Sequence, residues 1–252
     1  QFVTGPVRGL YMPDTIAHYT VGGQTYLVTA NEGDSRDYSG YSEEERVKNL
    51  TLDPTAYPNA AAIQADAWLG RLKSTTATGD TDGDGDIDQI YCYGARSFSI
   101  WNSAGQLVWD SGDQIEQTVA ATLPNNFNAN NDENDLDGRS DDKGPEPEAV
   151  AVAEIDGRWY AFIGLERVSG IMVYDITDPG APTFQQYINT RDFNVTPAGN
   201  GTGNPVDGLD IGPEGMRYVS AADSPTGEPL LIVGNEVSGS TTIFKVSHEL
   251  GN

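Results

Sequence analysis

Along most of the chain, short runs rich in β-branched and aromatic residues alternate with turns containing Gly, Pro, Asn and Asp. This pattern predicts strands joined by tight turns. Helical periodicity is confined to Tyr41–Leu50 and Ala60–Leu69, both within residues 39–79, which we expect to form a partly helical insertion. The pattern therefore predicts an all-β protein with one short helical insertion.

Three segments of the chain can be aligned with one another. In each, an acidic residue that follows a proline precedes one strand, and a glutamate follows the next strand. The three pairs are Asp14 and Glu32, Glu148 and Glu166, and Glu214 and Glu236. A fourth, degenerate copy spans Ile87–Gly112, with Arg96 at the place that Arg167 takes in the second segment.

Repeats of several strands are typical of β-propellers, so residues 1–252 are predicted to form a single propeller domain of about four blades. Four blades is a small number, and the chain opens at Gln1 without a signal peptide. We therefore expect either a small propeller or the C-terminal part of a larger one. A β-sandwich is the alternative, although it would not require the aligned proline–acid pairs.

Equivalent positions of successive blades are related by rotation about the central axis, so the repeated acids are expected to surround one mouth of the channel. Such a group of carboxylates suits hard cations, which take oxygen ligands. The predicted metal ligands at the mouth are Asp14, Glu148, Glu214 and Glu236. The alternative is structural: each acid accepts hydrogen bonds from turn N–H groups, or pairs with an arginine of a neighbouring blade.

The charge of the chain supports cations as partners. The 252 residues include 38 acidic and 14 basic side chains, which gives a formal net charge of −24. A field of this sign disfavours nucleic acids and anionic membranes. A surface adapted to salty surroundings would also account for part of this charge. One cysteine and two histidines argue against disulfide frameworks and against zinc or copper centres.

The most specific local motif is the sequence GDTDGDGDIDQIY, which we expect to form a calcium-binding loop over residues 80–91. Asp80, Asp82 and Asp84 occupy positions 1, 3 and 5 of an EF-hand-like loop, and Asp88 occupies position 9. Position 12 is a tyrosine where a sensor loop has a glutamate, and a strand follows, so a structural Ca²⁺ site is expected. The predicted ligands are Asp80, Asp82, Asp84, Asp86 and Asp88. A solvated acidic hairpin loop is the alternative.

A second acidic stretch, residues 125–147, leads directly to Glu148. Its aspartates at positions 135, 137, 141 and 142 are spaced for oxygen ligation, although their order fits no regular loop. We expect either contact with a metal or substrate, or a disordered acidic lid.

Several enzyme classes are poorly supported. The sequence contains no GxxxxGK[ST], GxGxxG, GxSxG or HExxH motif, which disfavours NTPases, Rossmann dehydrogenases, α/β-hydrolases and zincins. No apolar stretch approaches the ~20 residues needed to span a bilayer, so no membrane insertion is expected.

The runs YLVTANEGDSRDY, GDTDGDGDIDQIYCYGARSFSIW, RSDDKGPEPEAVAV and YAFIGLERVSGIMVYDITDP resemble the choice-of-anchor I family over almost the entire chain. That family includes proteins similar to a sea-urchin mesenchyme-specific cell-surface glycoprotein and to atypical bacterial alkaline phosphatases. The resemblance implies a propeller in an extracellular, cell-surface or periplasmic protein. Relatives often read PEPEG where this chain has Ala149, a change that leaves the carboxylates intact.

Two hypotheses of different classes follow. In the first, the protein is a Ca²⁺-dependent phosphoesterase. Glu148, Glu166, Glu214 and Glu236 would hold metal, Arg167 or Arg96 would bind the phosphate, and Glu32 would act as general base. In the second, it is a non-catalytic calcium-binding module of the cell surface, matrix or a biomineral.

Overall fold

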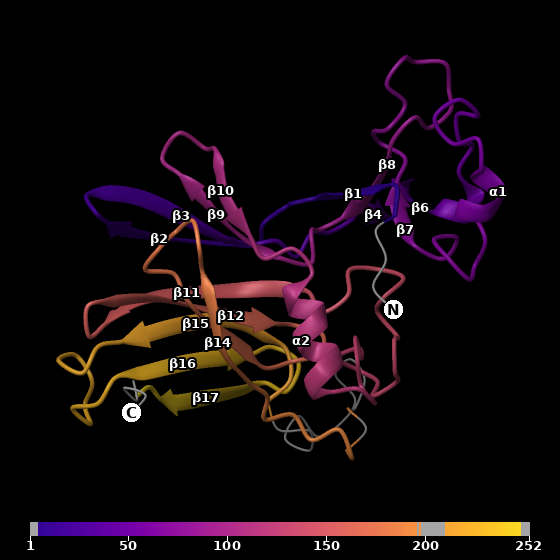
Figure 1. The fold of residues 1–252 in the computed structure, drawn as a ribbon. Coiled ribbons are helices and arrows are strands. Elements are labelled where there is room, and N and C mark those ends of the chain that lie inside the picture. Colours follow the sequence, from indigo (N-terminus) through magenta and orange to yellow (C-terminus); the bar gives the residue numbers. More distant parts are fainter. Residues whose placement is uncertain (1–4, 196, 198–209, 248–252) are drawn as a thin grey trace.

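Three antiparallel sheets dominate the computed structural model, which describes residues 5–195, 197 and 210–247 (Figure 1). In order across each sheet, the first contains β2 (Thr15–Val21), β3 (Gln24–Ala30), β9 (Phe98–Asn102) and β10 (Leu107–Asp110). The second contains β11 (Pro147–Ile155), β12 (Arg158–Leu165), β13 (Ile171–Asp175) and β14 (Thr183–Ile188). The third contains β15 (Pro213–Val219), β16 (Leu230–Asn235) and β17 (Ser240–Lys245). The all-β class is confirmed, and none of the sheets closes on itself within the described residues.

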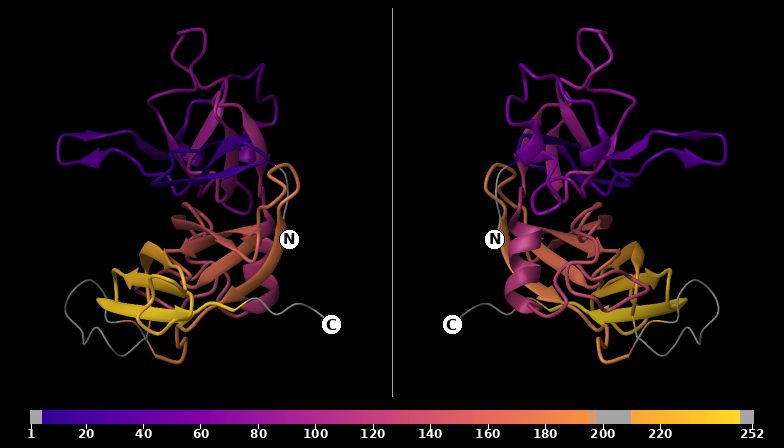
Figure 2. Two further views of the ribbon diagram at one scale, coloured as in Figure 1. Left: turned by 90° about the vertical axis from the view of Figure 1, so that its left-hand side faces the viewer. Right: turned by 90° about the vertical axis from the view of Figure 1, so that its right-hand side faces the viewer.

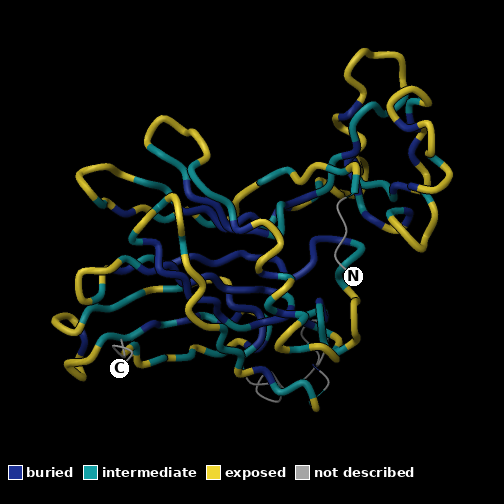
Figure 3. Tube along the Cα trace, viewed as in Figure 1, coloured by how far each residue is buried: buried dark blue, intermediate teal, exposed yellow. Residues whose placement is uncertain are grey.

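The three sheets pack against one another through their first strands. β11 contacts β2 on one side and β15 on the other, so the second sheet lies between the first and the third (Figure 1). Apolar side chains fill both interfaces, and the tube in Figure 3 is accordingly dark blue along the central strands. Burial of this apolar surface holds the stack together.

Helix α2 (Gln114–Thr122) covers the junction of the first two sheets. Its Ile115 and Val119 are fully buried in the same core cluster as Phe98 and Tyr174. Periodicity in this short segment did not suggest a helix, and packing of its apolar face stabilises it. No helix of the described residues is long and apolar enough to cross a membrane.

The segment between β3 and β9 forms a separate lobe at one end of the molecule (Figures 1 and 2). Its elements are β4 (Asp37–Tyr38), β5 (Tyr41–Ser42), β6 (Glu44–Arg46), the 3₁₀-helix η1 (Val47–Asn49), α1 (Ala60–Ile63), β7 (Lys73–Thr75) and β8 (Ile90–Tyr93). Strand β1 (Val7–Leu10) pairs with β8 in parallel. The lobe has its own small core, built around Val47, Ile63 and Ile90.

The lobe leaves and rejoins the first sheet through two glycines. A Cβ on Gly33 would lie 2.0 Å from the backbone N of Gly94, and a Cβ on Gly94 would lie 2.0 Å from the backbone O of Glu32. Both glycines have positive φ, of 77° and 67°. The two crossing segments of the chain can approach this closely because neither glycine has a side chain.

One local prediction is wrong, and another is correct only in part. The helix expected over Tyr41–Leu50 is replaced by β5, β6 and η1, because β6 pairs with β7 and the pairing overrides the helical pattern of charges. Of the helix expected over Ala60–Leu69, only Ala60–Ile63 is α-helical.

The expected fourth repeat, Ile87–Gly112, does not form a sheet of its own. Its strands β9 and β10 extend the first sheet, where β9 pairs with β3. Its first strand, β8, belongs to the lobe and pairs with β1. The strand pattern of this segment was recognised, but its strands serve two different parts of the fold.

Candidate metal centre

The three aligned segments share a backbone conformation at the start of their first strands. The residue two positions before each repeated acid has positive φ: 40° at Met12, 52° at Glu146 and 77° at Gly212. A proline follows each of them. The carbonyls of Glu146 and Gly212 accept the N–H of Glu166 and Glu236, at 2.8 and 2.7 Å. This conformation is uncommon for residues other than glycine, and here it directs the repeated acids toward the ends of the second strands.

The site contains three carboxylates that lie close together. Asp14 precedes β2, Glu32 follows β3, and Glu148 lies in an irregularity of the β11–β12 ladder between Pro147 and Val150. One carboxylate oxygen from each lies within 4.8 Å of the others. We name these three residues the mouth triad.

Glu148 is the unusual member of the mouth triad. It is only 8% exposed, and its Oε2 has no hydrogen-bond partner. No lysine or arginine of the described residues forms an ion pair with it. A buried carboxylate without a donor or cation is costly, so this position favours a cation as ligand.

Neighbouring acids are neutralised by basic side chains. Glu146 is fully buried and pairs with Arg139, with Lys143 at 2.9 Å and with Arg167 at 3.1 Å. Arg167 also lies 3.1 Å from Glu166, whose Oε1 accepts a hydrogen bond from Asn131 at 3.0 Å. Glu32, Glu146 and Glu166 are within ligating reach of one another, but Lys143, Arg139 and Arg167 already balance much of their charge.

The pKa values differ between Glu148, which has no basic partner, and Glu146, which has three. Burial, followed by the carboxylates of Glu166, Glu32, Asp14 and Glu214, raises the pKa of Glu148 to about 9. Burial also raises the pKa of Glu32 and Glu166 above the ordinary range.

Glu146 behaves in the opposite way. Burial acts to raise its pKa, but Arg167, Lys143 and Arg139 together lower it below the ordinary value. Glu146 therefore favours its ionised form at neutral pH, whereas burial and the neighbouring carboxylates favour the protonated form of Glu148 there.

The other predicted mouth ligands lie beside the mouth triad. Burial and the carboxylates of Glu236 and Asp14 raise the pKa of Glu214, which places Glu214 near both. Glu148 is also close enough to Glu214 to be affected by its charge. Asp14 and Glu148 thus lie together, and Glu214 is near enough for its charge to act on Glu148.

The two arginines predicted to bind substrate lie in different places. Arg167 lies among the mouth acids. Arg96 is outside this group: it pairs with Glu116 at 3.0 Å and donates hydrogen bonds to the carbonyls of Ser140 and Asp142, both at 2.8 Å. Arg96 therefore anchors the acidic stretch to α2.

Residues 125–147 are well connected to the rest of the chain. Asp141 pairs with Arg46 at 2.9 Å and with Arg71 at 2.8 Å, and Asp142 pairs with Lys73 at 3.1 Å. These contacts join the stretch to the lobe. The stretch supplies Lys143 and Glu146 to the mouth.

The predicted calcium loop forms two groups of carboxylates that share one residue. Asp80, Asp82 and Asp88 lie within 4.8 Å of one another, and so do Asp53, Asp86 and Asp88. Asp80 accepts the N–H of Gly83 at 2.6 Å and of Gly85 at 3.0 Å, which curls the loop around it. Asp84 accepts the N–H of Asp86 at 3.2 Å and belongs to neither group.

Three residues of these sites were missed as ligands or partners. Asp53 lies beside the loop because its neighbour Leu52 forms a parallel β-bridge with Ile87. These two residues are far apart in the sequence, so spacing alone does not predict the bridge. Lys143 and Asn131 lie in the acidic stretch and contact Glu32 and Glu166. The lone basic residue among the acids of the sequence DDKGPEPE is the signal that could have identified Lys143.

Comparison with known proteins identifies the family. The model of the choice-of-anchor I domain matches residues 1–179. The chain belongs to the choice-of-anchor I family. Gigasin-3a of Magallana gigas is similar to this choice-of-anchor I protein, with 34% identity over 195 residues that cover 73% of this chain and 67% of gigasin-3a.

A second relative is the mesenchyme-specific cell surface glycoprotein of Strongylocentrotus purpuratus. It is 27% identical over 271 aligned positions, which cover 94% of this choice-of-anchor I chain. The match spans 34% of the glycoprotein. The chain thus corresponds to about two thirds of one relative and one third of the other.

Proposed function

We propose that this protein is an extracellular or cell-surface calcium-binding protein with one Ca²⁺ site at the mouth triad and another in the loop at Asp80–Asp88. The observation that carries the proposal is the buried Glu148, whose Oε2 has no partner beside Asp14 and Glu32. Carboxylate oxygens are the ligands that Ca²⁺ prefers, and Ca²⁺ tolerates irregular geometry. Glu214 and water would complete the coordination.

The location is inferred from the family and its relatives. A choice-of-anchor domain and a relative described as a cell surface glycoprotein favour a protein exported to the cell surface or beyond. Abundant Ca²⁺ in that environment suits sites of moderate affinity. The three stacked sheets, related by a repeated conformation at their first strands, support the further proposal that they are blades of a propeller.

The proposal is tested by calorimetric titration of the calcium-free protein with Ca²⁺, and by melting in Ca²⁺ and in EGTA. Glu148→Gln keeps the shape of the side chain and removes its charge, so one binding event should be lost while the fold remains. Glu154→Gln, an exposed change in the same strand, is the matched control and should bind as the parent does. Equal Ca²⁺ binding by Glu148→Gln would contradict the mouth site.

A phosphoesterase is the second candidate, and the position of Arg167 favours it. Its guanidinium lies among the mouth acids, where a phosphate bound to Ca²⁺ would meet a second positive charge. In this proposal Glu148, Glu214, Glu166 and Glu236 hold the metal, and Glu32 takes a proton from water. Hydrolysis of p-nitrophenyl phosphate that requires Ca²⁺ and is lost in Arg167→Met would support it. No turnover with Ca²⁺ bound would leave the binding function alone.

A further inference from the structure

Two of the glutamates predicted at the mouth directly follow a buried asparagine. Asn31 lies between β3 and Glu32, and Asn235 ends β16 just before Glu236. The two asparagines are only 0% and 4% exposed. A buried amide is costly unless its N–H and C=O groups form hydrogen bonds, so the partners of these amides show what each asparagine holds in place.

The amide of Asn31 is held by two serines at its nitrogen and by a threonine at its oxygen. Nδ2 donates to Ser99 Oγ at 2.7 Å and to Ser97 Oγ at 3.2 Å, while Oδ1 accepts a hydrogen bond from Thr29 at 2.9 Å. Both serine hydroxyls donate to Asp110 Oδ2, at 2.6 and 2.9 Å. Because a carboxylate only accepts hydrogen bonds, each serine uses its proton there and accepts from the amide. The partners therefore fix the orientation of the amide.

The backbone around Asn31 is fixed as well. Its N–H donates to the carbonyl of Ser97 at 3.0 Å. The preceding residue, Ala30, accepts the N–H of Asp14 at 3.2 Å. Asn31 thus ties the chain that carries Glu32, together with its neighbour Asp14, to the start of β9.

The third sheet contains a matching set of groups. Nδ2 of Asn235 lies 3.1 Å from Ser240 Oγ, 3.0 Å from Thr242 Oγ1 and 3.3 Å from Asp210 Oδ1. The hydroxyl of Ser240 also donates to Asp210, at 3.1 Å. In both sheets an amide, two hydroxyls that are two residues apart and a carboxylate meet just before a predicted mouth glutamate.

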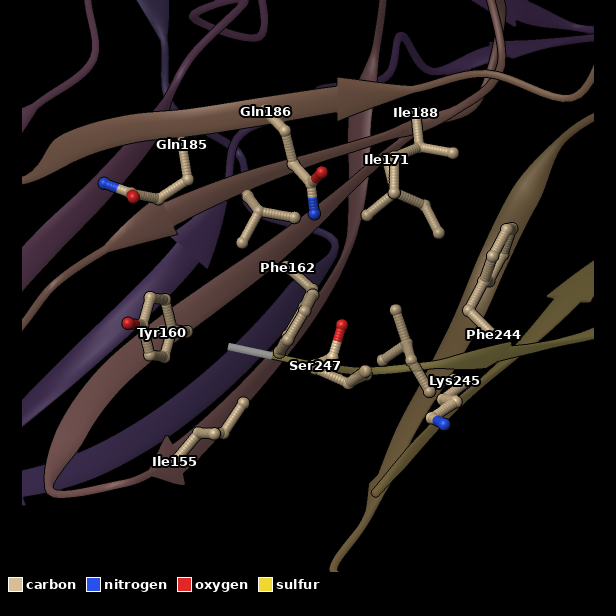
Figure 4. A pocket seen from close by; sticks show the side chains of 13 residues that line it. Ile155, Tyr160, Phe162, Ile171, Gln185, Gln186, Ile188, Phe244, Lys245 and Ser247 are labelled. Carbon is tan, nitrogen blue, oxygen red and sulfur yellow. The ribbon is translucent and has the colours of Figure 1, made fainter. Parts of the chain in front are cut away.

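One face of β17 changes from polar to apolar along the strand. Ser240, Thr242 and Phe244 share this face, because side chains two residues apart point the same way. Phe244 lines an apolar groove together with Phe162 and Ile171 (Figure 4). The hydroxyls therefore occupy the part of the face that reaches the amide, and apolar side chains occupy the part that lies further from it.

The second sheet shows that the position before the glutamate can be apolar. Leu165 precedes Glu166 there and is fully buried. Glu166 is held by contacts of its own carboxylate, with Asn131 at 3.0 Å and Arg167 at 3.1 Å. Apolar replacement of a buried hydrogen-bonded set can be nearly neutral for stability, so folding alone does not require an amide before Glu32.

Glu32 takes part in two groups of carboxylates. It lies within ligating reach of the other two residues of the mouth triad, and also of Glu146 and Glu166. Lys143 pairs with Glu32 and with Glu146, so it attracts the Glu32 side chain toward the second group. A backbone that is fixed at Asn31 limits how far Glu32 can follow, and it keeps one carboxylate oxygen beside the triad.

We propose that Asn31 is a positioning residue of the mouth triad, whose hydrogen-bonded amide holds Glu32 within reach of a metal ion. This role rests on the proposed Ca²⁺ site at the mouth. The matching set at Asn235 supports it, because the same groups recur before another predicted mouth glutamate. Removal of a group that orients a metal ligand commonly weakens metal binding by about tenfold or more.

The probe is terbium, bound to the Asp88→Asn variant. Asp88 is shared by both carboxylate groups of the calcium loop, so in its absence bound terbium reports on the mouth. Luminescence lifetimes in H₂O and D₂O give the water on the ion, and competition with Ca²⁺ gives the affinity. Asn31→Leu introduces the residue type that the second sheet has at this position. We expect it to add bound water, because solvent replaces the Glu32 oxygen, and to weaken Ca²⁺ binding about tenfold.

Val28→Ala is the matched control. Val28 is fully buried in β3, so its truncation lowers the melting temperature while the hydration and affinity of the mouth should stay those of the parent. If Asn31→Leu does not fold, Ser99→Ala removes the acceptor of the shortest amide hydrogen bond. It should add water in the same way, with a smaller loss of affinity.

Two results would overturn the role of Asn31, and they differ in what they say of the Ca²⁺ site. Unchanged hydration and affinity in the folded Asn31 or Ser99 variant, with an ion bound at the mouth, would overturn the positioning role alone. Equal terbium binding by the parent and by Glu148→Gln, both carrying Asp88→Asn, would overturn the mouth site itself and the positioning role with it.

Discussion

Lys143 Nζ lies 2.5 Å from Glu32 Oε1, which joins the acidic stretch of residues 125–147 to the end of β3. The same ammonium lies 2.9 Å from Glu146 Oε2 and 2.6 Å from the carbonyl of Gly33. Lys143 thereby takes a place among the mouth carboxylates that a metal ion could otherwise occupy. The mouth triad, on the other side of Glu32, has no such residue at Glu148. This asymmetry is why we place one Ca²⁺ at the mouth rather than two.

Calcium affinity at the mouth should rise with pH. Because the pKa of Glu148 is about 9 in the calcium-free protein, a proton competes with Ca²⁺ at pH 7. Release of one proton on binding corresponds to a gain of up to about tenfold in affinity per pH unit. Titration calorimetry from pH 6 to 9 in buffers of different ionisation enthalpy would measure the released proton. A pH-independent affinity would contradict the mouth site.

Without calcium, the stability of the protein should show the opposite trend. The pKa of Glu148 is higher in the folded state than its ordinary value of 4.5, so its contribution to stability is fully present below about pH 4.5. That contribution is lost as the pH rises toward 9. The melting temperature in EGTA should therefore fall as the pH rises over this range for the parent, and it should fall less for Glu148→Gln. Excess Ca²⁺ should abolish this difference in pH dependence between the parent and the variant.

Glu146→Gln should be strongly destabilising. Glu146 is fully buried and pairs with Arg139, Lys143 and Arg167, so removing its charge leaves three partly or fully buried cations without their common partner. A loss of about 3–5 kcal/mol in the free energy of unfolding is expected. Urea denaturation would measure it. Glu154→Gln, in an exposed position, should change stability by less than about 0.5 kcal/mol.

Asp53→Asn should weaken the loop site although Asp53 lies outside the calcium motif. Its carboxylate lies within reach of Asp86 and Asp88, and affinity for Ca²⁺ depends on the number of charged ligands. A three- to tenfold loss is expected, on the order of 1 kcal/mol. Terbium luminescence in the Glu148→Gln background would isolate this loop. Asp66→Asn, an exposed residue paired with Lys48 at 3.0 Å, is the control; equal losses in both would refute the assignment.

Gly94→Ala tests the close approach of the two chain segments, at Gly33 and Gly94, where the lobe leaves and rejoins the first sheet. A Cβ there would lie 2.0 Å from the carbonyl oxygen of Glu32, so Glu32 would have to move. Gly105→Ala is a matched control, because Gly105 has a similar positive φ of 75° and open space around its Cβ. We expect Gly105→Ala to cost about 1–2 kcal/mol and Gly94→Ala to cost more and to reduce Ca²⁺ binding at the mouth.

The all-β class and the proximity of Asp14 to Glu148 could be predicted from the sequence because both depend on local or repeated patterns. Strand alternation identified β2, β3, β11, β12, β15 and β16, and the proline–acid pairs identified Asp14, Glu148 and Glu214 as neighbours. The helix expected over Tyr41–Leu50 was wrong because pairing with β7 overrides local propensity. The fourth repeat was misassigned because strand pattern alone does not say which sheet a strand joins.

Arg167 was expected beside the mouth acids, but the other cations there could not be predicted from spacing. Lys143, Arg139 and Arg167 meet at Glu146 through the folding of the acidic stretch against Arg96 and the lobe. Asp53 likewise reaches the loop only through the bridge between Leu52 and Ile87. Such contacts depend on tertiary packing, which a single sequence does not encode in its periodicity.

The meeting of Gly33 and Gly94 has a consequence for how this protein can vary. A segment whose two ends touch, and which packs around its own core of Val47, Ile63 and Ile90, can be exchanged or shortened while the host sheet keeps its register. The proposed loop site would travel with that segment, whereas the mouth triad would stay with the sheets. The proposed Ca²⁺ sites of the loop and of the mouth triad could thus be gained, lost or altered in affinity independently of each other.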